Sequence, residues 1–147
     1  MIIGHGIDLV DVARIAASVE RHGQRFLDRV FTGAEQAYAA GSKRRLEHLA
    51  ARFAAKEAAL KALGTGWRSG IAWTDVEVIS QPSGAPMLHI TGRAAEIAAE
   101  RGIAAWHVSL SHTEFQAMAS VIASGFDRAT DHAGNDAPPH VRPDHRP

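Results

Sequence analysis

The stretch ARFAAKEAALKALGTG, residues 51–66, decides the fold because it holds the centre and the end of a long helix. Apolar side chains recur there at three- and four-residue spacing, which is the period of a buried helical stripe. The members of this stripe are Leu46, Leu49, Ala50, Phe53 and Leu60. At ~100° per residue, Glu57 projects to within about 40° of the middle of the stripe. One interpretation is a surface carboxylate that reaches solvent or pairs with Lys56 or Lys61. If Glu57 instead faces inward, it requires a cation, either Lys61 one turn later or a divalent metal, because an unpaired buried carboxylate is costly.

The residues before this helix predict one strand and two shorter helices. A glycine-punctuated strand is expected over residues 2–10, with Asp8 near its end, and a helix over residues 11–26. Thr32 and Glu35 stand at capping-box spacing and predict a short helix that stops before residue 41. Ser42 is expected to cap the long helix, which runs to residue 63.

The residues after the long helix predict two hairpins separated by a helix. Gly64 closes the long helix, and alternating segments at 71–80 and 87–90 form the first hairpin. An alanine-rich helix covers residues 91–101, and the segments AWHVSLS and FQAMASVIAS form the second hairpin. This element order indicates an α+β domain with a mostly antiparallel sheet.

The composition describes one globular domain followed by a different segment. Hydrophobic residues make up 46% of the 147 residues and charged residues 22%, enough apolar material for a core without disulfides. Residues 126–147 are polar and contain four of the six prolines. We therefore expect residues 1–125 to form the domain and residues 126–147 to be a disordered tail.

Charge and cysteine content restrict the partners and the compartment. The formal net charge is zero, so neither nucleic acid nor a membrane surface is expected as a general partner. The chain shows no secretory signal pattern and no apolar run of about 18 residues that would span a membrane. The absence of cysteine fits a reducing compartment, and a cytoplasmic location is the expectation.

A second acid, Asp8, is the candidate to share a cation with Glu57. Two oxygen ligands from distant segments suit Mg²⁺, which keeps several waters and completes its shell with substrate phosphates. A turn or capping role for Asp8 is the alternative, and nothing in the spacing alone brings the two carboxylates together.

Two clusters of basic residues accompany these acids. Arg14, Arg21 and Arg25 fall within about 40° of one another on the first predicted helix, a stripe that suits an acidic partner helix or forms a solvated face. The second cluster suits phosphate binding or serves solubility. Its members are Lys43, Arg44, Arg52 and Lys56.

The last hairpin carries a polar turn. Ser109 and Ser111 share one strand face and His112 stands at the bend, but no G-x-S-x-G elbow indicates a hydrolase triad. Either a structural or a binding role fits His112.

Three segments together resemble the holo-acyl-carrier-protein synthases, the small single-domain class of 4′-phosphopantetheinyl transferases. They are GHGIDLVDVARI, RFAAKEAALKALGTG and VSLSHTEFQAMASV, and the segment FTGAE adds to the match. The resemblance spans about residues 1–124, and the tail has no counterpart in the family pattern.

This resemblance implies an activity, a cofactor and an assembly. The family moves the phosphopantetheine arm of coenzyme A onto a serine of an apo acyl carrier protein, with Mg²⁺, in support of fatty acid biosynthesis. Family members of this size are homotrimers with sites between subunits.

The resemblance also implies roles for particular residues. Asp8 and Glu57 match the metal ligands, and Lys61 matches an active-site lysine. Arg14, Arg21 and Arg25 match the helix that receives the carrier. The coenzyme-binding set is Lys43, Arg44, Arg52, Lys56, Gly64, Thr65, Gly66, Ser111 and His112.

Two other functions compete with this hypothesis. A non-enzymatic module would bind coenzyme A and acidic helices with little dependence on Mg²⁺. Another Mg²⁺-dependent phosphotransferase is disfavoured, because the sequence contains no P-loop and no kinase motif.

Overall fold

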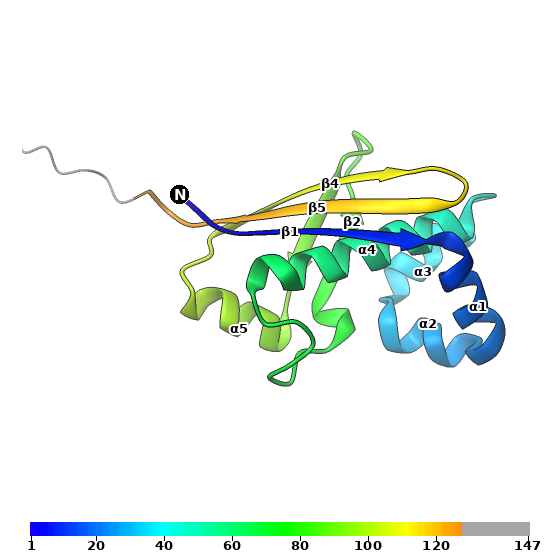
Figure 1. Cartoon of the computed structure of the whole chain (residues 1–147), viewed down its shortest axis with the longest axis horizontal. Coiled ribbons are helices and arrows are strands. Elements are labelled where there is room, and N and C mark those ends of the chain that lie inside the picture. The colour runs from blue at the N-terminus through cyan, green and yellow to red at the C-terminus, as the bar shows by residue number, and fades with distance from the viewer. Residues whose placement is uncertain (128–147) are drawn as a thin grey trace, which may run out of the picture.

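The structure is a computed structural model and describes residues 1–127. Its elements follow the order β-α-α-α-α-β-β-α-β-β (Figure 1). They are β1 (Ile2–Asp11), α1 (Val12–His22), α2 (Gln24–Val30), α3 (Gly33–Ala40), α4 (Arg45–Leu63), the 3₁₀ turn η1 (Trp73–Asp75), β2 (Val76–Ser80), β3 (Pro86–Ile90), α5 (Gly92–Glu100), β4 (Ala105–His112) and β5 (Gln116–Ser124). The predicted tail lies outside the described residues from residue 128 onward.

Two antiparallel sheets confirm the predicted α+β class. The larger sheet has the strand order β1-β5-β4, and the smaller one is the hairpin β2-β3. In the larger sheet Ala119 of the central strand β5 pairs with Asp8 of β1 on one side and with Leu110 of β4 on the other. The first strand of the chain is therefore joined to the last one described.

The long helix α4 lies along the three-stranded sheet and forms the centre of the core (Figure 1). The helices α1, α2 and α3 gather near one end of that sheet. The alanines on its inner faces are fully or almost fully buried. On β5 the buried residues are Ala117, Ala119, Val121 and Ala123, which alternate with residues on the outer face as a two-residue period requires. Small side chains on both elements bring helix and sheet close together.

Three element boundaries differ from the sequence prediction. Gly23 adopts a left-handed φ of 55° and divides the predicted first helix into α1 and α2. The long helix begins at Arg45 rather than at Ser42, because the Ser42 hydroxyl accepts a hydrogen bond from the Arg44 amide in the preceding turn. Residues 73–75 form a 3₁₀ turn, which the Asp75 carboxylate closes by accepting from the Ala72 amide.

Other local predictions are confirmed. Thr32 and Glu35 form the expected capping box, and Gly64 ends α4 in the left-handed conformation at φ 81°. Both hairpins form where the alternating segments place them. Among residues 1–127, no helix combines the length and the apolar character needed to cross a membrane.

Candidate active site

Strand β1 packs against the backbone of α4 through two glycines. A Cβ atom at Gly4 would lie 1.9 Å from the Ala62 carbonyl oxygen, and one at Gly6 would lie 1.9 Å from that of Ala58. No side chain fits in either place, so the pair Gly4 and Gly6 is required by the packing of strand on helix. His5, between them, faces outward and lies 3.1 Å from the Ser120 hydroxyl.

This packing sets the level of Asp8 along α4. Two strand residues advance about 6.6 Å and four helix residues about 6 Å, so each second residue of β1 meets the next turn of α4. After Gly4 at Ala62 and Gly6 at Ala58, Asp8 comes one turn closer to the helix N-terminus. Helical side chains lean toward the N-terminus of their helix, so the Glu57 side chain is directed toward the level of Asp8.

Lys61 reaches the first carboxylate directly. Its Nζ donates to Asp8 Oδ1 at 3.2 Å and to the Ile7 carbonyl oxygen at 2.8 Å. The Asp8 side chain is only 17% exposed, whereas that of Lys61 is 53% exposed. Lys61 lies one turn after Glu57, so its ammonium joins Asp8 of β1 to the part of α4 that carries Glu57.

Asp8 lies near the end of its strand, as expected. The strand ends at Asp11, one residue later than predicted, and the Asp11 carboxylate accepts from the Gln116 side chain at 3.1 Å. One correction applies to this group, since Lys61 pairs with Asp8 rather than with Glu57. Within residues 1–127, the half-buried Glu57 carboxylate has no ion-pair partner.

The arrangement fits a hard divalent cation. Among residues 1–127, no three His, Cys, Asp or Glu side chains gather as a metal cage. Two carboxylates with open positions are the donor set that Mg²⁺ uses when water and substrate phosphates complete its shell. Asp8 and Glu57 would supply the protein ligands of such an ion.

Lys56, the residue before Glu57, occupies an unexpected place. Its side chain is fully buried, and its Nζ lies 2.8 Å from Glu35 Oε1. The same ammonium donates to the Trp73 carbonyl at 3.2 Å and to the Val76 carbonyl. Burial lowers the pKa of Lys56, and the charge of Glu35 opposes that shift. The structure therefore corrects the prediction that Lys56 binds coenzyme A.

Arg52 is also turned inward. It is 3% exposed, donates to the Ser80 hydroxyl at 3.2 Å and stacks with its guanidinium carbon 4.1 Å from the Tyr38 ring centre. Burial lowers its pKa, while Glu35 and Tyr38 oppose the shift. We expected Arg52 and Lys56 on an exposed face of the long helix. In the structure this face of α4 is buried in the interior.

A polar hollow lies at the start of α4 beside the last hairpin. Its lining residues are Arg44, Glu47, His112, Thr113 and Glu114. His112 Nδ1 lies 3.2 Å from a Glu47 carboxylate oxygen, and its ring lies 5.9 Å from that of His48. The structure therefore brings Arg44 and His112 together, as expected of a coenzyme site, and adds Thr113.

Other predicted coenzyme-binding residues are placed apart from this hollow. Ser111 points to the outer face of the sheet, because it alternates with His112 along β4. Lys43 is exposed in the turn before α4. Gly64, Thr65 and Gly66 form a turn at the other end of α4, where Gly66 has a φ of 59°.

The three arginines of the predicted stripe are exposed but do not share one helix. Arg14 and Arg21 line a shallow hollow on α1, together with Ser18 and His22. The break at Gly23 moves Arg25 to α2, where it lines a second hollow with His22, Phe26 and Arg29. A third hollow adjoins them and reaches the aromatic side chains of Phe53 and Trp73. The basic surface is therefore broader than a single stripe and has apolar recesses.

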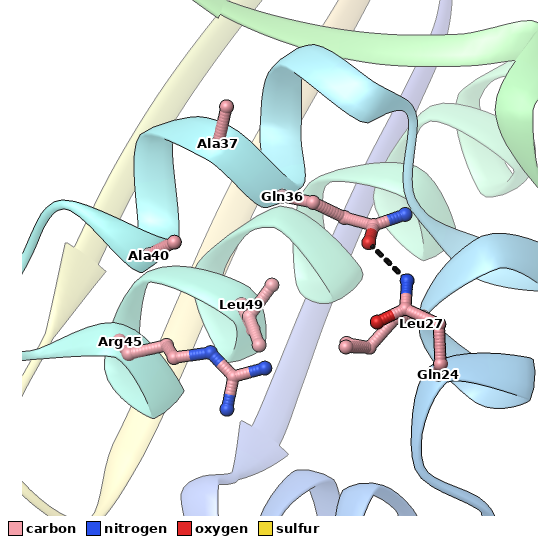
Figure 2. A pocket seen from close by; sticks show the side chains of 7 residues that line it. All are labelled: Gln24, Leu27, Gln36, Ala37, Ala40, Arg45 and Leu49. Atoms are coloured by element: carbon pink, nitrogen blue, oxygen red, sulfur yellow. Dashed lines mark hydrogen bonds between the residues drawn. The ribbon is translucent and has the colours of Figure 1, made fainter.

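Figure 2 shows a further hollow between α2, α3 and α4. Gln24 and Gln36 join across it by a hydrogen bond of 2.8 Å, and Arg45 points into it from the start of α4. The complete lining is Gln24, Leu27, Gln36, Ala37, Ala40, Arg45 and Leu49. None of the predicted site residues borders it.

The fold indicates a class of enzyme, and comparison with known proteins identifies that class. Residues 4–118 match the family model of the 4′-phosphopantetheinyl transferase superfamily. The chain belongs to this superfamily.

Relatives within the family carry one name. The chain is 52% identical over 122 residues to the holo-[acyl-carrier-protein] synthase of Koribacter versatilis, which covers 83% of this chain and 98% of that protein. It is 51% identical over 125 residues to the synthase of Desulforudis audaxviator, covering 85% and 95% of the two chains.

Solved structures of the same kind share the fold. The holo-[acyl-carrier-protein] synthase from Neisseria meningitidis superposes with a TM-score of 0.77 at 34% identity, covering 84% of this chain and 99% of that one. The synthase from Bacillus anthracis in complex with CoA (3′,5′-ADP) gives a TM-score of 0.71 at 34% identity, covering 86% and 99%.

Sequence reasoning missed Glu35, Glu47 and Thr113. The capping-box pattern identified Glu35, but only as a cap, because a pattern within four residues carries no information about Lys56, 21 positions later. Glu47 and Thr113 enter the hollow with Arg44 and His112 only when the sheet is folded.

Proposed function

We propose that this protein transfers the 4′-phosphopantetheine group of coenzyme A to a serine hydroxyl of an apo acyl carrier protein. The serine oxygen forms a bond to the phosphorus that carries pantetheine, the pyrophosphate bond breaks, and adenosine 3′,5′-bisphosphate leaves. The observation that carries this proposal is the group Asp8, Glu57 and Lys61 at the contact between β1 and α4, in a chain of this superfamily. Holo-carrier is a requirement of fatty acid synthesis, which is the process we assign.

The site supplies charge neutralisation and positioning, which are the main needs of a phosphoryl transfer. Mg²⁺ held by Asp8 and Glu57 would withdraw charge from the pyrophosphate oxygens. Lys61, whose ammonium already lies beside Asp8, is placed to neutralise the charge that develops on the leaving phosphate. The serine proton passes either to Glu57 or to solvent held in the site.

The hollow at the start of α4 is our proposed place for the nucleotide end of coenzyme A. Arg44 supplies a fixed positive charge there, and His112 and Thr113 supply further polar groups. The loop Gly64–Thr65–Gly66 lies at the opposite end of α4, so a single chain does not bring all the expected coenzyme contacts together. This separation supports a site shared between subunits.

A homotrimer would meet that need. The outer face of the three-stranded sheet exposes Ile7, Leu9 and Met118 at 51%, 59% and 40%. Large apolar side chains on one sheet face are typical of an interface, and a second copy of the chain is the occupant we propose. Ser111 lies on the same outer face and would then reach a neighbouring subunit.

The surface around Arg14, Arg21 and Arg25 is the proposed docking site for the carrier. Exposed arginines beside apolar recesses suit an acidic helix that carries apolar side chains. We further propose a cytoplasmic location, which fits the absence of cysteine and would place the protein beside coenzyme A and its carriers.

The decisive experiment is intact-mass spectrometry of an apo acyl carrier protein after incubation with this protein, coenzyme A and Mg²⁺. We expect the carrier to gain the mass of one phosphopantetheine group, and EDTA to prevent the gain. Coenzyme A binding without any gain across several carriers would favour the non-enzymatic binding module instead.

A Glu57→Gln variant tests the metal assignment within the same assay. The substitution removes a ligand charge and keeps the side-chain size, so we expect transfer to be lost while the circular dichroism spectrum is unchanged. Normal turnover by this variant would contradict the role given to Glu57.

A further inference from the structure

Glu35 of α3 and Lys56 of α4 form a buried ion pair, and Lys56 is the residue immediately before Glu57. Successive side chains leave a helix about 100° apart, so Lys56 and Glu57 point to different sides of α4. Lys56 points toward α3 and β2, whereas Glu57 lies near the side that β1 covers. The direction of one side chain therefore determines the direction of the other.

Every polar atom of the pair has a partner. The three protons of the Lys56 ammonium are directed to Glu35 Oε1, the Trp73 carbonyl and the Val76 carbonyl. Glu35 Oε1 also accepts from the Thr32 amide at 2.9 Å, and its other oxygen accepts from the Val78 amide at 3.0 Å. The pair thus connects four elements, namely α3, α4, η1 and β2, at one buried point.

Stability alone is a weak reason for such a pair. Removing two charges from water costs about as much as their attraction returns, and apolar replacements of similar volume are often neutral or stabilising. What an apolar side chain does not reproduce is direction, because three acceptors hold the ammonium along three fixed lines.

The opposite side of α4 carries a contact of a different kind. There the backbone carbonyls of Ala58 and Ala62 meet Gly4 and Gly6 at close range, and the Lys61 side chain joins the helix to Asp8 and to the Ile7 carbonyl of β1. A rotation of α4 about its axis would swing Glu57 away from Asp8. Because the Lys61 side chain is half exposed and the Glu35–Lys56 pair is fully buried, the buried pair is the firmer polar restraint on that rotation.

We propose that Glu35 and Lys56 are positioning residues, which fix the rotation of α4 so that Glu57 faces Asp8. This inference rests on the proposed function, in which Asp8 and Glu57 hold the metal together. Neither Glu35 nor Lys56 touches the substrate, since both side chains are fully buried.

The test compares metal binding in two folded variants. The double variant Glu35→Gln with Lys56→Met removes both charges, keeps the length of the first side chain and shortens the second by one atom. The control Ile97→Ala removes a buried side chain on α5 and should lower stability while leaving the Glu35–Lys56 pair in place. Mn²⁺ binding is measured by titration calorimetry with coenzyme A present and carrier absent, and melting temperatures are recorded for every protein.

We expect the Kd for Mn²⁺ to rise about tenfold in the double variant, the size of effect seen when groups behind metal ligands are removed. The Ile97→Ala control is expected to melt earlier and to bind Mn²⁺ like the wild type. In transfer assays, the Mg²⁺ concentration for half-maximal rate should rise in the double variant more than the KM for coenzyme A.

An unchanged Kd in the double variant, with wild-type protein that binds Mn²⁺ and transfers normally, would overturn the positioning role and leave the proposed function intact. Wild-type protein that neither binds Mn²⁺ nor modifies a carrier would reject both. If the double variant fails to fold, Glu35→Asp takes its place: it keeps the charge, shortens the side chain, and should raise the Kd in the same direction.

Discussion

Replacing Gly6 with alanine tests how closely the site depends on the contact between β1 and α4. The new Cβ would lie 1.9 Å from the Ala58 carbonyl oxygen and 2.8 Å from the Ala62 amide nitrogen. An ordinary carbon–oxygen contact is about 3.3 Å, so strand and helix must separate by about 1.4 Å. Both neighbours are backbone atoms inside a helix and cannot rotate out of the way.

Two consequences of this separation are measurable. Overpacking of this kind costs about 1–3 kcal/mol of unfolding free energy. Asp8 lies two residues along the same strand, and a displacement near 1 Å in a site costs about 10²-fold in rate. We expect Gly6→Ala to fold, to unfold at lower denaturant concentration, and to lose about two orders of magnitude in kcat/KM.

The matched control is Gly33→Ala at the start of α3. A Cβ there would meet nothing within 4 Å, and alanine is the better helix former. This variant should be as stable as the wild type or slightly more stable, with unchanged activity. Gly6→Ala with wild-type stability and wild-type kcat/KM would refute the account of the glycine pair.

Three further predictions address the docking surface, the assembly and the pH dependence of stability. Arg14→Glu with Arg21→Glu should raise the KM for an acidic carrier far more than the KM for coenzyme A, and equal changes would argue against docking there. Leu9→Glu places a charge on the exposed outer sheet face and should shift the proposed trimer toward monomer in analytical ultracentrifugation, whereas an unchanged sedimentation profile would exclude this face as the interface. Burial, followed by the charges of Arg52 and His112, lowers the pKa of His48 below its ordinary 6.5, against the opposing charge of Glu47. The unfolded chain therefore takes up this proton first, so unfolding free energy should fall as the pH drops from about 7 to 5, less steeply in His48→Gln; identical slopes would contradict the assignment.

Local signals explain the parts of the fold that the sequence predicts. The apolar stripe of α4, the capping box at Thr32 and the alternation in β5 each involve residues a few positions apart. The chemistry that decides them is present in the segment itself, so the elements were predicted correctly. The position of Glu57 among apolar neighbours is a local signal of the same kind, whereas its sharing of a cation with Asp8 followed from the family resemblance and stays a prediction.

The errors arise where distant segments decide the outcome. Lys56 was interpreted as a surface cation, because nothing near it in the chain shows that Glu35 and two carbonyl groups of residues 73–76 will surround it. The apolar period of residues 11–26 likewise predicted one continuous helix, but Gly23 has a positive φ, and one such residue is enough to end a helix. Packing at long sequence separation determines both features.

The pairing of β1 with β5 also governs the order of folding. The register runs from Ile2 opposite Ser124 to Asp11 opposite Gln116, so the sheet joins residues more than one hundred positions apart. Contacts of such high contact order form slowly, because a long loop must close before they return any stability. The helices and the hairpin β2-β3 depend on nearer contacts and are able to form earlier. Asp8, carried by the earliest strand in the chain, is thus among the last residues to reach its place, and enzymatic activity should appear in the final phase of refolding.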